Sequence, residues 1–342
     1  MFHVYVNYPD NTPNYTSVAD AFAAISEGYT PSDAAYPAPQ EDLEWATIHI
    51  APGIYRECLV LERPNVILQG ESAENTTLVY GNYANDIMED GSKRGTFRTA
   101  AFRIHTHDVS ACNITFQNDA GFGHTVGQAL ALYVDGDRIQ FHNCRLLGSQ
   151  DTLFTAPLPM KEAQPGGFTG PGEHNPRTMG RHYFEDCFIQ GDVDFIFGSA
   201  VTYFKNCEIF SKKPEKLPPE TLADKKIFGY VTAASTPENE AFGYVFESCR
   251  LTSDCPKHSI FLGRPWREYA KTVFLRCELG EHIHPDGWND WNKTHGHFYY
   301  GEYRSYGPGA NPESRADFSV QLTDGEAKRY TISNVLNGWI PS

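Results

Sequence analysis

Asp151 and Asp194 are the residues of this sequence best suited to chemistry, because each acid stands beside apolar residues in a strand-like segment. Asp151 lies in "GSQDTLF" and Asp194 in "GDVDFIFG". A carboxylate set against large apolar side chains must be paired, or it loses much of its solvation energy. Two acids that share a site typically have different pKa values and therefore different tasks.

Three further segments carry unusual polar residues inside strand-like runs. Gln128 lies in "GQALAL" at the head of an alternating strand, Gln150 directly precedes the first of the two acids, and Arg264 and Trp266 lie in "LGRPW". A guanidinium group binds a carboxylate through two parallel hydrogen bonds and stays charged, so Arg264 is a suitable partner for Asp194. On neighbouring coils of a stacked fold, these side chains would form one site.

Each of these residues also has an ordinary structural interpretation. Asp151 is compatible with a turn in which the side chain bonds to its own backbone. Gln128 could be an exposed strand end, Arg264 an exposed surface charge, and Trp266 a core residue. Asp194 is the hardest to explain in this way, because three large apolar residues follow it.

Other catalytic signatures are missing from the sequence. There is no G-x-S-x-G, no H-E-x-x-H and no phosphate-binding loop motif. The segment "EHIHPD" contains His282, His284 and Asp286, but two histidines in a polar loop are a weak metal signal. We therefore expect neither a metal nor a cofactor.

A repeated segment organises the chain and must position these side chains. Six short strand-like segments share a cysteine that small or polar residues precede and β-forming residues follow: Cys112, Cys144, Cys187, Cys207, Cys249 and Cys277. Their irregular spacing indicates a solenoid with loops of variable length. Since no C-x-x-C occurs, we expect buried free thiols rather than zinc ligands or disulfides.

The predicted fold is all-β: a right-handed, single-stranded parallel β-helix with short terminal capping helices. Helical patterns occur at residues 16–25 and 324–336, where helices would cover open sheet ends. We expect one domain over residues 1–342, with a long Pro- and Gly-rich loop at about 156–180. A β-sandwich is the alternative, but few Asp-Gly pairs stand between two alternating strands.

Composition excludes several classes of partner. The chain has 342 residues, 40% of them hydrophobic, and a net charge of −15. This charge disfavours nucleic acid, anionic membranes and any polyanion whose charge is not masked. No apolar run is long enough for a membrane span, and no leader pattern is visible. We expect a cytoplasmic monomer if the chain is full length, and otherwise a secreted protein whose leader has been removed.

The ordered motifs "GIYRE", "GQALAL", "QDTLF", "DVDFIFG" and "LGRPW" closely resemble the pectin methylesterase (pectinesterase) family, carbohydrate esterase family 8. The resemblance extends over nearly the whole chain. It implies a parallel β-helix that removes methyl esters from the galacturonate units of pectin or oligogalacturonides, releases methanol and needs no metal.

The resemblance also implies a role for each matching residue. Asp194 would be the nucleophile, and Asp151 the general acid and then the general base. Gln128, with help from Gln150, would stabilise the oxyanion. Arg264 would keep the nucleophilic carboxylate ionised.

Trp266 and Phe197 are the expected substrate-binding residues of the sugar groove. Strict alternation in the strand would place Asp194 and Ile196 on one face, with Phe195 and Phe197 on the other. Phe197 would then reach the groove only if the strand bends.

The rival functions lie in three classes. A pectin lyase would need a calcium-binding cluster of acids, and a polygalacturonase would need carboxylates arranged for water attack on the sugar. A carbohydrate-binding solenoid would have no reason to retain both Asp and both Gln residues. We hypothesise that the loop at about 156–180 sets the preference for chain length or methylation pattern.

Overall fold

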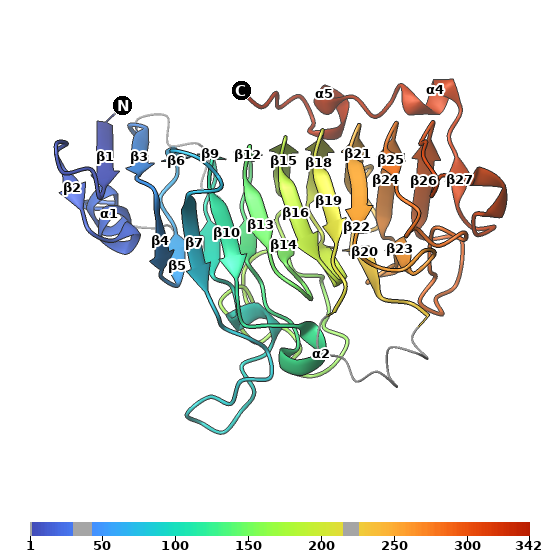
Figure 1. The fold of residues 1–342 in the computed structure, drawn as a ribbon, viewed down its shortest axis with the longest axis horizontal. Helices are drawn as coiled ribbons and strands as arrows, with labels where there is room; N and C mark the ends of the chain where they lie inside the picture. Colours follow the sequence, from blue (N-terminus) through green and yellow to red (C-terminus); the bar gives the residue numbers. More distant parts are fainter. Residues whose placement is uncertain (1, 30–42, 215–225) are drawn as a thin grey trace.

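The chain winds into coils whose strands stack in three parallel sheets (Figure 1). The computed structural model describes residues 2–29, 43–214 and 226–342. From β3 to β26, consecutive strands belong to different sheets, and every pairing among the named strands is parallel; β12 pairs with β15 and β14 pairs with β17, for example. The prediction of a parallel β-helix is therefore confirmed.

The three sheets differ in length. The largest contains, in spatial order, β2 (Asn14–Tyr15), β1 (Phe2–Val6), β3 (Ala46–Ile50), β6 (Val66–Gly70), β9 (Val109–Cys112), β12 (Ile139–His142), β15 (Arg181–Glu185), β18 (Val201–Lys205), β21 (Tyr244–Glu247), β24 (Lys271–Leu275), β26 (Tyr299–Tyr303) and β27 (Val320–Gln321). The second contains β25 (Glu278–Leu279), β22 (Arg250–Ser253), β19 (Glu208–Ser211), β16 (Phe188–Gly191), β13 (Arg145–Leu147), β10 (Thr115–Asn118), β7 (Thr76–Tyr80) and β4 (Gly53–Arg56). The third contains β23 (Ile260–Gly263), β20 (Gly229–Ala234), β17 (Val193–Gly198), β14 (Leu153–Thr155), β11 (Leu132–Asp135), β8 (Phe102–His105) and β5 (Leu59–Leu61).

The helix α1 (Val18–Ile25) lies at the N-terminal end of the coil, beside the first strands (Figure 1). Ser17 caps it by accepting a hydrogen bond from the backbone N–H of Asp20. Its apolar face is buried over the end of the core, as predicted for a capping helix.

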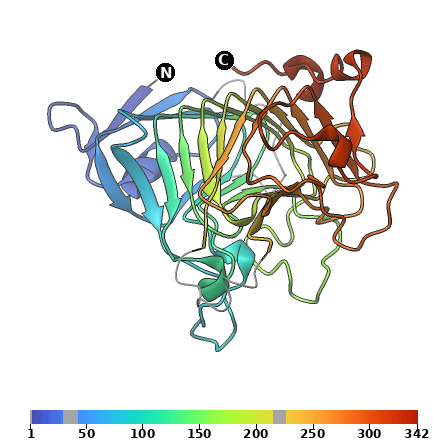
Figure 2. The same cartoon turned by 45° about the vertical axis from the view of Figure 1, so that its right-hand side comes forward.

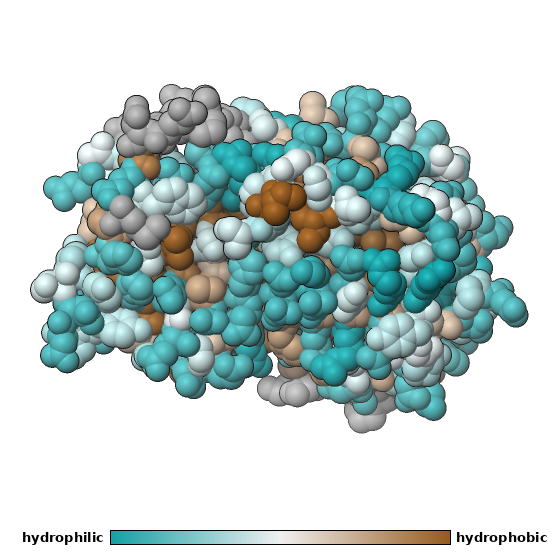
Figure 3. Space-filling view, turned by 90° about the horizontal axis from the view of Figure 1, so that it is seen from above, coloured by the Kyte–Doolittle hydropathy of each residue, from teal (hydrophilic) through white to brown (hydrophobic). Residues whose placement is uncertain are grey.

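The C-terminal helices α4 (Asp324–Ala327) and α5 (Ile332–Val335) are placed differently. They run back along the outside of the largest sheet, where Val335 packs in one cluster with Tyr203 and Val245 (Figure 1). The last residue, Ser342, reaches Gln140 on β12. These helices therefore cover the outer face of a sheet rather than its open end. From the side on which they lie, the surface is mostly hydrophilic, with a small hydrophobic patch near its centre (Figure 3).

Short helical turns interrupt the coils elsewhere. In the described part of the chain they include α2 (Gly123–Val126) and 3₁₀ turns at Thr96–Arg98 and Pro312–Ser314. Figures 1 and 2 both show α2 on the side of the molecule opposite to the two chain ends.

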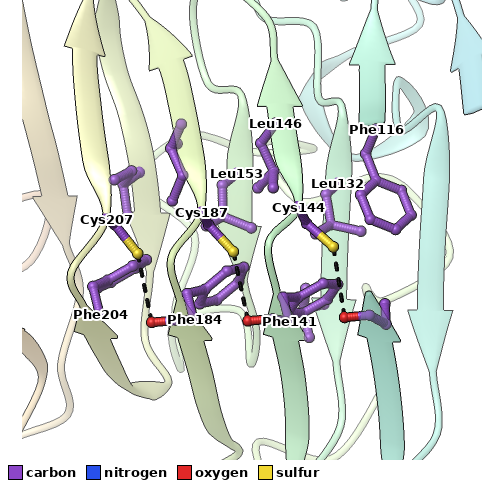
Figure 4. Close-up of a cluster of buried hydrophobic side chains, with 14 of the residues drawn as sticks. Phe116, Leu132, Phe141, Cys144, Leu146, Leu153, Phe184, Cys187, Phe204 and Cys207 are labelled. Atoms are coloured by element: carbon purple, nitrogen blue, oxygen red, sulfur yellow. Dashed lines mark hydrogen bonds between the residues drawn. The ribbon is translucent and has the colours of Figure 1, made fainter. Parts of the chain in front are cut away.

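A ladder of five cysteines runs through the interior, and Figure 4 shows the part of it that contains Cys144, Cys187 and Cys207. Each thiol donates a 3.5 Å hydrogen bond to a backbone carbonyl of the preceding coil: Cys144 to Ala111, Cys187 to Phe141, Cys207 to Phe184, Cys249 to Phe204 and Cys277 to Phe246. The residue before each cysteine has a positive φ, a conformation that Asn and Asp adopt more readily than most residues. All eight cysteines are free, as predicted.

Cys112 does not belong to this ladder. It pairs in register with His142, and the positive-φ residue follows it as Asn113. Ile114 therefore takes the inward position that Cys144 occupies one coil later.

An aromatic stack runs beside the cysteines and stabilises the same coils. Phe204 is fully buried, and its ring centre lies 5.1 Å from that of Phe184 and 4.4 Å from that of Phe246. We expect Phe204→Ala to lower the free energy of unfolding by about 3–5 kcal/mol, because the cavity cannot collapse between two fixed coils. Urea denaturation measures this. Phe210→Ala is the matched control, since Phe210 is only half-buried on the outer face of β19, and an equal loss there would contradict the prediction.

Candidate active site

The polar residues singled out from the sequence lie around one cavity of about 270 Å³ on the outer side of the third sheet. Six of them line it: Gln128, Gln150, Asp151, Asp194, Phe197 and Trp266. Arg264, directly after β23, contacts the cavity through Asp194. Stacking of coils thus brings together side chains that are up to 138 positions apart in the chain.

Asp194 and Arg264 form a buried bidentate ion pair. Arg264 Nε donates to one carboxylate oxygen at 2.8 Å, and Nη2 donates to the other at 2.6 Å. The guanidinium carbon lies 3.8 Å from the ring centre of Tyr230 and 3.7 Å from that of Trp291. Two aromatic faces and a fork of hydrogen bonds therefore fix the arginine, and the arginine fixes the carboxylate.

Both acids have a backbone conformation that is uncommon outside glycine. The φ angle is 62° at Asp151 and 50° at Asp194. Such angles cost free energy and persist where the surroundings impose them, which is frequent at functional sites. The backbone N–H of Asp151 donates to the carbonyl of Val193 at 3.1 Å, and this bond joins the two acidic segments.

The positive φ at Asp194 also breaks the alternation expected for β17. The register with β20 shifts between Val193 and Ile196. Phe195 and Ile196 both lie in the main core, whereas Asp194 and Phe197 both line the cavity. The predicted pairing of Asp194 with Ile196 on one face is therefore wrong, and the irregular backbone is the reason.

The two carboxyl groups differ in their electrostatic surroundings. Burial raises the pKa of Asp151 well above its ordinary value, and the nearby charge of Asp194 raises it further. Burial also raises the pKa of Asp194, but the hydrogen bonds and the charge of Arg264 oppose this effect. Because Asp194 is directly paired with the arginine, Asp151 is the better suited of the two acids to hold a proton.

The two glutamines are held beside the acids by backbone contacts. The carbonyl of Gln128 accepts from Ala84 N–H at 2.8 Å, and that of Gln150 accepts from Ala129 N–H at 3.1 Å. Gly123 in α2 lies so close to Gln150 that a Cβ atom there would be 2.5 Å from the Cβ of the glutamine. The arrangement supplies two amide groups at the edge of the cavity that contains both carboxyl groups.

An aromatic wall closes the other side of the cavity. Trp266 packs against Phe197, with ring centres 5.6 Å apart, and against Phe168, with ring centres 6.4 Å apart. Phe168 and Gln164 belong to the predicted loop at 156–180. The loop therefore contributes to the cavity.

Several residues of the site were not found from the sequence. Tyr230 and Trp291 stack on Arg264, Phe97 lines the cavity, and Arg267 and Lys293 lie close to the ion pair. For Arg267 the adjacent motif was a usable signal, because it directly follows Trp266. The other residues lie on segments that the folding of the intervening loops brings to the site. No sequence pattern marks them.

The "EHIHPD" segment does not form a cluster. His282 is buried, while His284 packs on Phe261 and lies 3.7 Å from Asp286. Across residues 2–29, 43–214 and 226–342, no group of three or more His, Cys, Asp or Glu side chains is arranged to hold a metal ion. Within the same ranges, the helices are all too short or too polar to cross a membrane.

The model of the family described as Pectinesterase matches the chain over residues 14–158 and 177–339. The break between the two matched segments falls inside the loop at 156–180. Together the two segments cover most of the chain.

Among curated proteins, Pectinesterase 31 of Arabidopsis thaliana is 32% identical over 332 residues, which are 94% of this chain and 88% of that protein. "Pectinesterase/pectinesterase inhibitor PPE8B" of Prunus persica is 32% identical over 97% of this chain, but this chain spans only 57% of the peach protein.

Two of the similar solved structures superpose on almost the full length of this chain. The pectin methylesterase PemA from Erwinia chrysanthemi superposes with a TM-score of 0.77 at 30% identity, covering 99% of this chain and 98% of that one. A pectin methylesterase in complex with a hexasaccharide superposes with a TM-score of 0.78 at 30% identity, covering 100% of this chain and 99% of that one.

The prediction of a cytoplasmic location is wrong. It rested on the lack of a leader pattern in the first residues, whereas the plant relatives are secreted cell-wall pectinesterases. The first ten residues contain β1, which pairs with β3 as part of the largest sheet. Their pattern reflects a strand of the fold and carries no information about compartment.

Proposed function

The chain belongs to the pectinesterase family, and from this we propose that it hydrolyses the methyl esters of galacturonate units in pectin or oligogalacturonides and releases methanol. One observation carries the proposal: an aspartate paired with an arginine through two hydrogen bonds and a second aspartate with a raised pKa face the same cavity.

In the proposed mechanism, Asp194 attacks the ester carbonyl carbon through a carboxylate oxygen. The tetrahedral intermediate collapses as the C–OCH₃ bond breaks, and the leaving oxygen takes the proton of Asp151, giving methanol and an anhydride on Asp194. Asp151, now a carboxylate, removes a proton from water. The hydroxide attacks the anhydride, which restores the Asp194 carboxylate, leaves Asp151 protonated and forms the galacturonate acid.

Arg264 has two tasks in this scheme. It keeps Asp194 ionised in a buried position, and its two hydrogen bonds limit the orientations of the carboxylate. The aromatic rings of Tyr230 and Trp291 hold the guanidinium in turn. Trp266 and Phe197 offer apolar surface to the sugar ring at the aromatic side of the cavity.

Gln128 and Gln150 are the proposed oxyanion donors. Because their amides donate most strongly when charge develops on the ester oxygen, we expect Gln128→Ala to lower kcat by about 10²- to 10³-fold with little change in KM. Methanol release measures this. Gln140→Ala is the control, since Gln140 lies on the largest sheet and bonds to Ser342. A raised KM with an unchanged kcat would contradict the proposed role.

The proposed substrate is an extended oligosaccharide. One related pectin methylesterase is known in complex with a hexasaccharide.

The family model spans residues near both ends of this chain. We propose that residues 1–342 form one catalytic domain that acts as a monomer.

The loop at 156–180 is proposed to set the preferred substrate length. Because Phe168 contributes one aromatic wall, Phe168→Ala should change the ratio of kcat/KM between a hexamer and a trimer by about two- to tenfold. Rates on size-defined methylated oligogalacturonides measure the ratio. An unchanged ratio would remove the loop from substrate selection.

The proposed activity is tested by methanol release from highly methylated pectin and from short methylated oligogalacturonides, with EDTA present. Release that EDTA does not affect supports the mechanism above, in which only side chains of this chain take part. No methanol from either substrate would reject the proposed function.

A further inference from the structure

A groove in two parts lies where the C-terminal segment covers the outer face of the largest sheet. The volumes of the two parts are about 390 and 600 Å³, and Tyr330 lies in the wall of both. We call them together the C-terminal groove. The cavity of Asp151 and Asp194 is on the other side of the molecule, because Gly123 of α2 lies beside Gln150, and α2 lies opposite to the chain ends (Figures 1 and 2).

The lining of the C-terminal groove is more basic than the protein as a whole. Five Lys or Arg and three Asp or Glu side chains line it, whereas the whole chain has 28 Lys and Arg against 43 Asp and Glu. The five basic residues are Lys271, Arg276, Arg304, Lys328 and Arg329. A local excess of positive charge on an acidic protein favours an anionic ligand at this face.

Arg276 and Arg304 occupy a backbone position at which arginine is uncommon. Their φ angles are 53° and 49°, and they directly follow Leu275 and Tyr303, which pair in register on β24 and β26. On the four preceding coils the equivalent residues are small or short polar ones: Asn143, Asp186, Asn206 and Ser248. A positive φ suits Asn and Asp better than a long side chain. Two successive arginines at this position therefore indicate a use for their guanidinium groups.

Both guanidinium groups are held over one tyrosine ring. The guanidinium carbons of Arg276 and Arg304 lie 5.7 and 5.2 Å from the ring centre of Tyr303. Arg304 Nη2 donates to both carboxylate oxygens of Asp324 at 3.0 Å, and Arg276 Nη2 donates to Glu247. A guanidinium carries five N–H donors, and the two side chains are 45% and 64% exposed. Further donors of both arginines are therefore accessible to a ligand.

Aromatic rings provide the apolar part of the groove surface. Phe242 packs edge-on against Tyr330, with ring centres 5.5 Å apart. Tyr299 lines the groove next to Lys271, its register partner on the neighbouring strand. A sugar acid has an apolar ring face that packs on such rings and a carboxylate that pairs with the cations. The groove therefore suits a sugar acid better than a simple anion.

We propose that the C-terminal groove binds a de-esterified, and therefore anionic, stretch of polygalacturonate on the face away from the catalytic cavity. This inference rests on the proposed function, whose product is the free acid. A polymer held in the groove by its de-esterified part keeps its methylated part at a raised local concentration near the cavity. The groove thus lowers KM for long polymer chains without changing kcat.

The kinetic test compares Arg276→Gln/Arg304→Gln with the control Arg250→Gln/Lys257→Gln. Both double variants remove two positive charges from exposed ion pairs, because Arg250 and Lys257 also pair with a glutamate each, at 2.7 and 2.8 Å. We expect the groove variant to raise KM on long, partly de-esterified pectin by about threefold at unchanged kcat. A methylated trimer is too short to occupy groove and cavity together, so its KM and kcat should not change.

The control variant should match the wild type on both substrates. An unchanged KM of the groove variant on long pectin would overturn the proposal. An equal rise in KM in both double variants would assign the effect to net charge, and a rise on the trimer would assign it to the catalytic cavity. Either result would also overturn the groove.

A binding measurement separates this inference from the proposed function, because calorimetry with fully de-esterified polygalacturonate needs no turnover. The groove variant should bind this polymer about threefold more weakly than the control variant at low salt, and the difference should vanish at high salt. Fully methylated pectin, which is neutral, should bind to both variants equally. Equal affinity of the two variants for polygalacturonate overturns the groove even if methanol is released normally. If the wild type releases no methanol, the proposed function fails, while calorimetry still reports whether the groove binds the acid.

Discussion

Asp194→Asn is expected to abolish methanol release, lowering kcat by about 10⁴-fold or more, as removal of the nucleophile does in other hydrolases. The amide has nearly the shape of the carboxylate and keeps an oxygen for Arg264, but it cannot attack the ester carbonyl. The measurement is methanol release under substrate saturation, with circular dichroism and thermal unfolding to show that the variant is folded.

Asp137→Asn is the matched control for this variant. Asp137 also binds an arginine through both carboxylate oxygens, accepting from Arg181 Nε at 2.8 Å and from Nη2 at 2.5 Å, but it is not among the residues that line the cavity. Loss of a buried Arg–Asp pair as such should affect stability in both variants, whereas activity should fall only in Asp194→Asn. Retention of more than a tenth of the activity by Asp194→Asn would reject Asp194 as the nucleophile.

Asp151→Asn is expected to lower kcat by about 10²- to 10⁴-fold and at the same time to stabilise the protein at neutral pH. The loss of activity follows because an amide can neither protonate the leaving methoxide nor take a proton from water. The gain in stability follows because burial and the charge of Asp194 raise the pKa of Asp151 in the folded state, so the ionised form is unfavourable there.

The sign of the pH dependence is fixed by this raised pKa. Above the ordinary Asp pKa of about 3.9, the unfolded chain releases the proton while the folded protein retains it. The free energy of unfolding of the wild type therefore falls as pH rises from about 4 toward the folded pKa of Asp151. Asparagine does not titrate, so the stability advantage of Asp151→Asn should grow over the same range.

Urea unfolding of both proteins between pH 4 and pH 8 measures this difference. A difference that stays constant with pH would mean that Asp151 has an ordinary pKa in the folded protein, and its role as general acid would then lose its basis. The wild-type activity should also fall on the alkaline side, as Asp151 loses the proton that methanol needs.

The candidate site could be predicted to a large extent from the sequence. Gln128, Gln150, Asp151, Asp194 and Trp266 were named from short motifs, and all five line one cavity. The proposed partner of Asp194 was also correct, because Arg264 binds it through two hydrogen bonds. Polar residues inside apolar strand segments need partners, and this need is visible in the sequence itself.

The errors arose where the backbone departs from regular geometry or where loops decide proximity. Strict alternation failed at Asp194 because its φ is positive and the register shifts beside it. Cys112 was grouped with the ladder, but Ile114, two residues later, takes the inward position instead. Trp291 and Lys293 could not be found because contacts between distant segments, such as the hydrogen bond from Asn289 to Gly263, bring their loop to the site.

The sequence by itself determined the strands, the terminal helix at residues 18–25, the free thiols and the chemical types in the site. These properties depend on residues that are neighbours in the chain, such as an Asn before a Cys or an acid before aromatic residues. Only the tertiary structure decided which coils lie beside one another and how Arg264 is enclosed. Loops of different length separate successive coils, so contacts between them depend on stacking register and on single backbone angles that no short segment specifies.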